Sequence, residues 1–280
     1  MTNTPLVSTS WLADHVDDPA VIILDATWFM PGDPREAAKV YATAHIPGAH
    51  FFSIDTISDH ATDVPHMIAA PSDFAVAARR LGVNAASTVV VYDGEGLFSA
   101  SRVWWNFRAM GHATTFVLDG GLPRWIAEGR SVETGWRDAI HGDFKSRPDP
   151  RLVRDMTQVR QALDAKSAQI VDARPAGRFT GAVPEPRADL RGGHMPGAVN
   201  LPYSLLVENG ALLAPDAISA AFEAVGIDLA KPIVTTCGSG VTAGVLTLAL
   251  AAIGRDDVAV YDGSWSEWGA RTDTPVVVGP

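Results

Sequence analysis

The sequence is poor in cysteine and carries no excess of positive charge. Its 280 residues include one cysteine, Cys237, so the chain can form no internal disulfide and offers no cysteine pair to a zinc ion. The formal net charge is -10, with 22 lysine and arginine residues against 32 aspartate and glutamate residues, and no run of basic residues offers a local exception. A chain with this charge is not expected to bind nucleic acid.

Long apolar segments and cofactor motifs are also missing. The longest apolar candidate, 241–253, is shorter than the roughly 20 residues that cross a bilayer, and residues 1–14 lack the pattern of a signal peptide. We therefore expect no membrane contact and a cytoplasmic location. The eight histidines show no metal-binding spacing, and no glycine-rich nucleotide motif occurs, so no metal or organic cofactor is expected.

One pattern is written twice along the chain. The apolar runs 21–25 and 170–172 both end in aspartate, and the segments 45–49 (His-Ile-Pro-Gly-Ala) and 194–198 (His-Met-Pro-Gly-Ala) follow them. Matching positions lie 143 to 149 residues apart, a period far too long for a solenoid. We interpret the chain as a duplicated domain, and we expect the histidine that begins each segment to have a structural role in both copies.

Each copy alternates short buried runs with amphipathic segments. The segments 72–81 and 216–225 are typical of helices, with Ser72 and Asp216 as the expected N-caps. This alternation predicts an α/β fold in which each copy forms an open, mostly parallel sheet flanked by helices. The predicted domains are 1–139 and 155–280, joined by a linker at 140–154 that contains two prolines.

The single cysteine stands in a distinctive loop. A buried run, 233–236, leads into Cys237-Gly238-Ser239-Gly240-Val241-Thr242, and an apolar, helix-like run follows. Two glycines allow the loop to curl with its N–H groups pointing inward, and a helix N-terminus after it favours a thiolate over a thiol. Most lone cysteines are simply buried in a core. Here the loop favours a reactive nucleophile instead.

The matching loop of the first copy has no cysteine. Asp93 occupies the position of Cys237, so only the second copy can carry sulfur chemistry, and the first is expected to serve as a scaffold that borders the cleft. A cysteine phosphatase would need an arginine six residues after the nucleophile. Position 243 is alanine, which argues against that class.

The duplicated pattern, the two His-x-Pro-Gly-Ala segments, the Cys237 loop and the closing segment 261–269 resemble the two-domain sulfurtransferases of the rhodanese superfamily. The resemblance covers nearly the whole chain and implies two tandem rhodanese-like domains. It also implies that Cys237 takes sulfur from a donor, becomes a persulfide and passes the sulfur on. The implied acceptor is a thiol, such as a thioredoxin-like protein, or cyanide.

The residues beside the cysteine bear on the donor. Thiosulfate-specific relatives carry basic residues there, whereas this chain has the neutral Gly238 and Ser239, which favours an organic thiol donor. The resemblance implies that Arg178 and Arg187 hold the carboxylate and keto oxygen of 3-mercaptopyruvate, a task suited to the guanidinium fork. Without the resemblance, ion pairs of these arginines with neighbouring acidic residues would be the simpler interpretation.

The resemblance also implies a proton relay made of Ser239, His66 and Asp55, the last two from the other domain. Without it, His66 and Asp55 would be taken for surface residues. Two alternative functions stay open: transfer of sulfur from thiosulfate, and a carrier that holds persulfide without recognising a small donor.

The remaining loop residues are expected to contact the donor: Gly238, Gly240, Val241 and Thr242.

Overall fold

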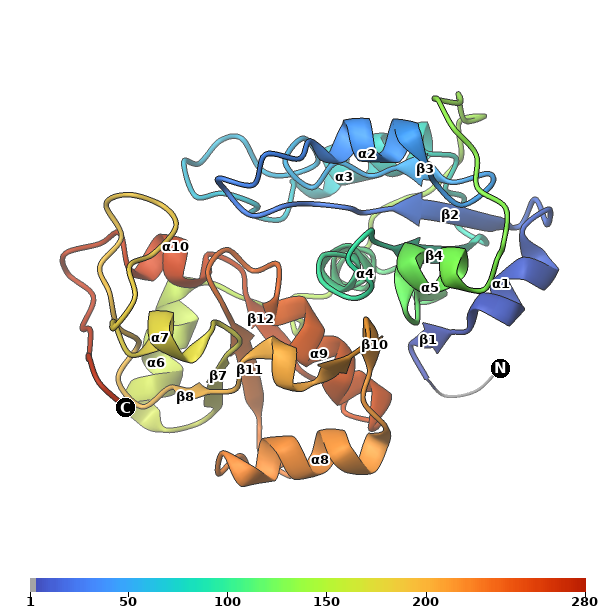
Figure 1. Ribbon diagram of the computed structural model, residues 1–280. Helices are drawn as coiled ribbons and strands as arrows, with labels where there is room; N and C mark the ends of the chain where they lie inside the picture. The colour runs from blue at the N-terminus through green and yellow to red at the C-terminus, as the bar shows by residue number, and fades with distance from the viewer. Residues whose placement is uncertain (1–3) are drawn as a thin grey trace.

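The computed structural model describes residues 4–280, which form two five-stranded sheets. The first has the strand order β1-β5-β4-β2-β3 and the second the order β6-β12-β11-β7-β8, and every pairing within them is parallel. Because β1 corresponds to β6 and β4 to β11, the two orders are the same. The predicted α/β fold and the duplication are therefore confirmed (Figure 1).

The first half contains the following elements in order: β1 (Leu6–Val7), α1 (Thr9–His15), β2 (Val21–Asp25), α2 (Ala37–Thr43), β3 (His50–Phe51), α3 (Pro71–Arg80), β4 (Thr88–Tyr92), α4 (Ala100–Ala109), β5 (Thr115–Leu118) and α5 (Gly121–Ala127). The second half contains β6 (Val153–Arg154), α6 (Met156–Ala165), β7 (Gln169–Asp172), α7 (Ala176–Phe179), β8 (Val199–Asn200), the 3-10 turn η1 (Tyr203–Leu205), β9 (Val207–Glu208), β10 (Ala211–Leu212), α8 (Pro215–Ala224), β11 (Ile233–Thr236), α9 (Ala243–Ala252), β12 (Ala259–Tyr261) and α10 (Ser264–Trp268).

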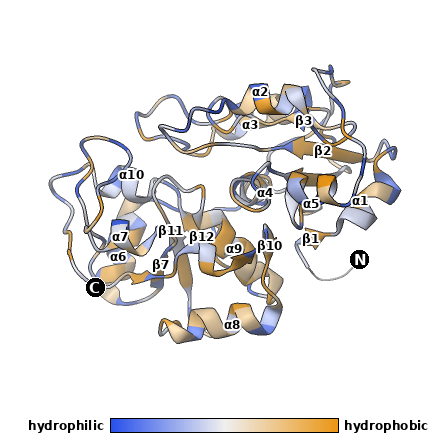
Figure 2. Ribbon diagram, viewed as in Figure 1, coloured by the Kyte–Doolittle hydropathy of each residue, from blue (hydrophilic) through white to orange (hydrophobic). Residues whose placement is uncertain are grey.

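The two halves meet along α4 and α9, which lie between the two sheets in Figure 1. Helix α9 consists mostly of alanine, leucine and valine, which Figure 2 colours orange, and a helix that is apolar on all sides must be buried on all sides. Gly244 allows the close approach, since a Cβ there would lie 2.8 Å from the main-chain nitrogen of Arg102. One continuous hydrophobic core therefore runs through both halves.

Two equivalent hydrogen bonds cross between the halves. The N–H of Ile68 donates to Asp262 Oδ2 at 2.8 Å, and the N–H of Leu212 donates to Asp119 Oδ1 at 3.1 Å. Asp262 directly follows β12, and Asp119 directly follows β5, the strand of the first half that corresponds to β12. Each aspartate accepts its hydrogen bond from a residue of the other half. The two halves thus contact each other through hydrogen bonds that are related by approximate two-fold symmetry.

The expected N-caps of α3 and α8 are wrong. The caps are Ala70 and Ala214, neither of which makes a side-chain capping bond, and each helix begins with a proline. Proline at the first helical position has a suitable φ and needs no hydrogen-bond acceptor, so each N-cap lies two residues before the expected one. Ser72 and Asp216 fall inside the first turn.

The segment predicted as a linker packs against the first half. Its Phe144 is 2% exposed and belongs to the core, and its main chain bonds to residues of the first half through Gly142 and Phe144. The chain then enters the second sheet at β6. The predicted boundaries of the domains, 1–139 and 155–280, stay a prediction.

The repeated histidines make equivalent contacts. Nδ1 of His45 lies 2.9 Å from the Tyr41 carbonyl, and Nδ1 of His194 lies 3.0 Å from the Phe179 carbonyl. Each ring also stacks on the aromatic side chain of that partner residue. Both histidines stabilise a turn, as expected of a structural residue.

No helix in the described part of the chain has the length and apolar character needed to cross a bilayer.

Candidate active site

Cys237 lies at the carboxyl end of β11, between the ends of β7 and β12, where open parallel sheets commonly bind ligands. Its side chain is 2% exposed. The two loop glycines differ in their surroundings, and only Gly240 has the positive φ that favours glycine. A Cβ at Gly238 would lie 2.8 Å from the Arg178 guanidinium, and one at Gly240, whose φ is +78°, would lie 2.5 Å from that of Arg102.

The loop after Cys237 presents open hydrogen-bond donors. Within residues 4–280, the main-chain N–H groups of residues 238–242 donate to no protein acceptor. The inert loop differs. There the Asp93 carboxylate accepts the N–H groups of four residues at 2.8 to 3.0 Å: Glu95, Phe98, Ser99 and Ala100. The first copy therefore fills its cradle with its own carboxylate, whereas the second copy leaves its cradle open to an anionic sulfur.

The predicted relay residues lie together beside this loop. Nδ1 of His66 is 2.9 Å from Ser239 Oγ, and Nε2 of His66 is 2.9 Å from Asp55 Oδ1. Trp28 donates its indole N–H to the same carboxylate oxygen at 3.1 Å. His66 has a φ of 64°, an uncommon conformation for a residue with a side chain, and such strain often marks a functional site. The first half thus places the Asp55–His66 pair next to the Cys237 loop of the second half.

Burial and charge set the protonation of this histidine. Burial lowers the pKa of His66, and the positive charges of Arg187 and Arg102 add to that effect, while Asp55 opposes it. The hydrogen bond with His66 lowers the pKa of Asp55. At neutral pH the pair therefore consists of a neutral imidazole and an ionised carboxylate, an arrangement in which the imidazole can accept a proton.

Arg102 connects the elements of this site, although the sequence did not predict it. Its side chain lies on α4, is fully buried and stacks on the ring of Trp105. The guanidinium donates to Asp262 Oδ1 at 2.6 Å, to the His66 carbonyl at 2.5 Å and to the Gly240 carbonyl at 3.4 Å. One arginine of the inert half therefore fixes both the relay and the cysteine loop. No local signal distinguishes Arg102, because α4 also contains the polar residues Asn106 and Arg108.

The two predicted arginines have different surroundings. Arg178 donates to Glu185, whose side chain is 1% exposed and also pairs with Arg174 at 2.7 Å. Arg187 forms no ion pair within residues 4–280. Burial lowers its pKa, while the nearby Cys237 acts in the opposite direction. Arg178 therefore forms an ion pair with Glu185, whereas Arg187 remains available to an anion.

These residues surround a cavity of about 140 Å³, the inner cavity. Most of the residues predicted to contact the donor line this cavity. Gly240 does not, because it lies against the Arg102 guanidinium. Its walls are formed by Trp28, Met30, Phe98, Pro175, Arg178, Arg187, Tyr203, Cys237, Gly238, Ser239, Val241 and Thr242. A cysteine, an unpaired arginine and open amides in one small space suit a small anionic sulfur compound. No group of potential metal ligands occurs in the described residues.

A cysteine in an open amide loop, at the sheet edge of one of two duplicated domains, suits a transferase that acts through a cysteine nucleophile. The rhodanese-like domain matches residues 8–128 and again residues 155–271, and the chain belongs to this family.

Relatives of known function cover nearly the whole chain. It is 46% identical over 277 residues to the 3-mercaptopyruvate sulfurtransferase of Escherichia coli K12, with 99% of each chain covered. It is 43% identical over 271 residues to the thiosulfate sulfurtransferase of Bos taurus, covering 94% of this chain and 91% of the relative. The crystal structure of the Escherichia coli enzyme SseA superposes with a TM-score of 0.87 at 44% identity, covering 94% of this chain and all of that one.

Proposed function

We propose that this protein is a 3-mercaptopyruvate sulfurtransferase, which moves sulfur through a persulfide on Cys237 to an acceptor thiol and releases pyruvate. The observation that carries the proposal is the open row of loop amides around Cys237, facing the unpaired Arg187 and the Asp55–His66–Ser239 relay. The sulfurtransferases of Escherichia coli and of Rattus norvegicus, the latter 42% identical, support the choice of donor.

The first half-reaction breaks the carbon–sulfur bond of the donor. The Cys237 thiolate attacks the donor sulfur, a sulfur–sulfur bond forms, and the electron pair of the carbon–sulfur bond passes to the enolate of pyruvate. The enolate takes up a proton, and the donor thiol loses one. Ser239 is placed to pass that proton because its Oγ lies within hydrogen-bond distance of His66.

The arginines position the donor in this scheme. Arg187 has its full guanidinium available for the donor carboxylate, and bidentate hydrogen bonds of this kind are the strong ones. Glu185 holds Arg178 through Nε and one terminal nitrogen, which leaves the other terminal nitrogen for the keto oxygen. Two arginines line the cavity, whereas Glu185, which pairs with Arg178, is not among the residues that line it. An anionic donor is therefore attracted, while Glu185 fixes the orientation of Arg178.

Two alternatives share this fold. A thiosulfate sulfurtransferase would use the same cysteine, and the bovine relative carries that name. The neutral Gly238 and Ser239 in the loop favour the organic donor, since thiosulfate carries two charges. A persulfide carrier would have no use for an anion-binding arginine in the cavity. The cytoplasmic location stays a prediction, because one Arabidopsis thaliana relative, 41% identical, is named as mitochondrial.

The proposal predicts a ping-pong stoichiometry. Before any acceptor is added, the reduced protein should release a burst of one pyruvate per chain from 3-mercaptopyruvate, with one sulfur atom added to its mass. Addition of a thiol should accelerate further pyruvate release. Rapid quench with pyruvate detection and intact mass spectrometry measure both quantities. Pyruvate release without a burst, or pyruvate without added sulfur, would contradict the proposal.

The relay predicts how the pH profile changes when Asp55 is replaced by asparagine. The Asp55 carboxylate stabilises protonated His66, so its loss lowers the pKa of His66 further below the usual value of about 6.5. The acidic limb of kcat/KM should move to lower pH, and the maximal rate should fall about 10-fold or more because the imidazole loses the partner that orients it.

Asp63→Asn is the matched control for this prediction, since Asp63 lies in the same segment, is exposed and makes no side-chain hydrogen bond in the described structure. Its profile should coincide with that of the unaltered protein. An acidic limb that moves to higher pH in Asp55→Asn, or that stays in place at full activity, would remove Asp55 from the relay.

A further inference from the structure

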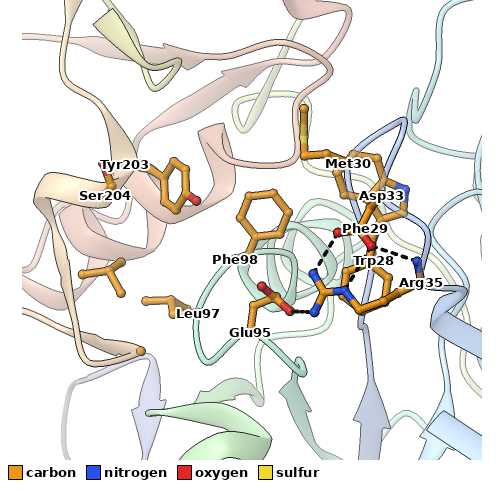
Figure 3. A pocket seen from close by; sticks show the side chains of 12 residues that line it. Trp28, Phe29, Met30, Asp33, Arg35, Glu95, Leu97, Phe98, Tyr203 and Ser204 are labelled. Atoms are coloured by element: carbon orange, nitrogen blue, oxygen red, sulfur yellow. Dashed lines mark hydrogen bonds and ion pairs between the residues drawn. The ribbon is translucent and has the colours of Figure 1, made fainter. Parts of the chain in front are cut away.

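A second, larger cavity opens next to the inner cavity. This outer groove has a volume of about 360 Å³ and shares four wall residues with the inner cavity: Trp28, Met30, Phe98 and Tyr203. Figure 3 shows the rings of Phe98 and Tyr203 side by side in the groove. The ring centroids of Trp28 and Phe98 are 6.0 Å apart, and those of Phe98 and Tyr203 are 5.5 Å apart. A ligand bound here would lie on an aromatic wall that leads toward Cys237.

The outer groove carries charge of the opposite sign to the inner cavity. Arg35 lies between two carboxylates, bonding to Asp33 at 2.8 Å and to Glu95 Oε1 at 2.7 Å (Figure 3). Asp33 uses both of its oxygens for Arg35, whereas Glu95 Oε2 has no donor within residues 4–280. Two carboxylates against one guanidinium leave a net charge of -1. Glu95 therefore offers a free carboxylate oxygen at the edge of the groove.

Negative charge also affects Tyr203, which lies in the wall of the groove. Burial raises the pKa of Tyr203, and the charges of Asp93 and Glu95 raise it further. The groove is thus apolar along its wall and negative at its edge, which disfavours an anion such as 3-mercaptopyruvate. It suits a ligand with a short apolar body and a positive charge.

We propose that the outer groove binds the sulfur acceptor, and that this acceptor is a small aminothiol whose ammonium group pairs with Glu95 while its thiol enters the inner cavity. The inference rests on the proposed function, because only a loaded Cys237 needs an acceptor. Continuity with the inner cavity supplies the path, and the change of charge between the two spaces separates an anionic donor from a cationic acceptor. Donor and acceptor thus use neighbouring sites of opposite charge.

The transfer balances without any further reactant. The acceptor thiol releases its proton to the solvent, and its thiolate attacks the outer sulfur of the Cys237 persulfide. A new sulfur–sulfur bond forms to the acceptor, the bond to Sγ of Cys237 breaks, and its electron pair returns Cys237 to a thiolate. The acceptor leaves as a persulfide, and the protein is ready for another donor.

The test follows the discharge of protein that is fully loaded with persulfide. Three thiols of similar size serve as probes: cysteamine, which is cationic, 2-mercaptoethanol, which is neutral, and 3-mercaptopropionate, which is anionic. Loss of the added sulfur is timed by mass spectrometry at low ionic strength, where the interaction of exposed charges is least screened. Each rate is compared between variants for one thiol at a time, which cancels the intrinsic reactivity of the thiols.

Glu95→Gln should lower the rate of discharge by cysteamine about two- to fivefold, as expected for the loss of an exposed ion pair. The rate with 2-mercaptoethanol should not change, and the rate with 3-mercaptopropionate should rise. Ser204→Trp narrows the groove at a residue outside the inner cavity and should slow all three thiols. Glu223→Gln, an exposed carboxylate on α8, is the control and should change none of them. Equal effects of Glu95→Gln on the three thiols, or none, would overturn the assignment.

The two proposals fail in different ways. If the protein takes no sulfur from 3-mercaptopyruvate, the proposed function is wrong, and the persulfide can still be prepared with inorganic polysulfide. A dependence of its discharge on Glu95 and on the charge of the thiol would then support the groove alone. If loading from 3-mercaptopyruvate succeeds while discharge ignores Glu95 and Ser204→Trp, the function stands and the groove assignment is wrong.

Discussion

Replacement of Cys237 by serine should abolish sulfur loading, with pyruvate release from 3-mercaptopyruvate reduced by at least about 1,000-fold. A serine hydroxyl is a far weaker nucleophile than a thiolate, and the chain has no other cysteine to take over. The measurements are intact mass after incubation with the donor and the rate of pyruvate formation. The mass of the variant should remain unchanged at every donor concentration.

This loss should occur without unfolding. The Cys237 side chain is 2% exposed and lies in a loop that α10 also holds, through hydrogen bonds to the carbonyls of Cys237 and Gly238. Serine differs by one atom, so the melting temperature should fall by only a few degrees. A folded Cys237→Ser variant that still adds sulfur, or that still turns over the donor, would show that the nucleophile lies elsewhere.

The second large effect concerns the arginines of the inner cavity. Replacement of both Arg178 and Arg187 by glutamine should lower kcat/KM for 3-mercaptopyruvate by about 1,000-fold, because hydrogen bonds to a charged group contribute about 1.5 to 3 kcal/mol each. Most of the loss should appear in KM for Arg187→Gln. In Arg178→Gln the buried Glu185 also loses a cationic partner, so stability should fall as well.

The matched control is the pair Arg151→Gln and Arg271→Gln. Both arginines form ion pairs with neighbouring aspartates at the surface and lie outside the inner cavity. This double variant should keep full activity. If the Arg178 and Arg187 double variant loads sulfur at an unchanged rate, the protein does not recognise the donor through these residues, and the persulfide carrier becomes the better description.

The fold was predictable because its signals are local and repeated. Continuous apolar runs such as 233–236 indicate buried parallel strands, and the same order of strand, turn and helix in both halves indicates duplication. The Cys237 loop could be recognised for the same reason, since its glycines and the following helix stand next to one another in the sequence. Its counterpart Asp93 could be placed only by aligning the two copies.

Contacts between distant segments were not predictable from local patterns. Arg102 lies 160 positions from Asp262, and nothing near either residue indicates that they form a buried ion pair. The choice of Glu185 as the partner of Arg178 rather than of Arg187 depends on the turn after α7, which the sequence alone does not define. The outer groove joins three separate stretches of chain, so it exists only in the folded molecule.

The most direct test of the central claim compares two sulfur donors on the same reduced protein. Incubation with 3-mercaptopyruvate should add one sulfur atom to Cys237 and release one pyruvate, while thiosulfate at the same concentration should load little. Intact mass spectrometry and peptide mapping record the result. Efficient loading from thiosulfate with none from 3-mercaptopyruvate would contradict the account of the donor, and loading from neither would contradict the account of the enzyme.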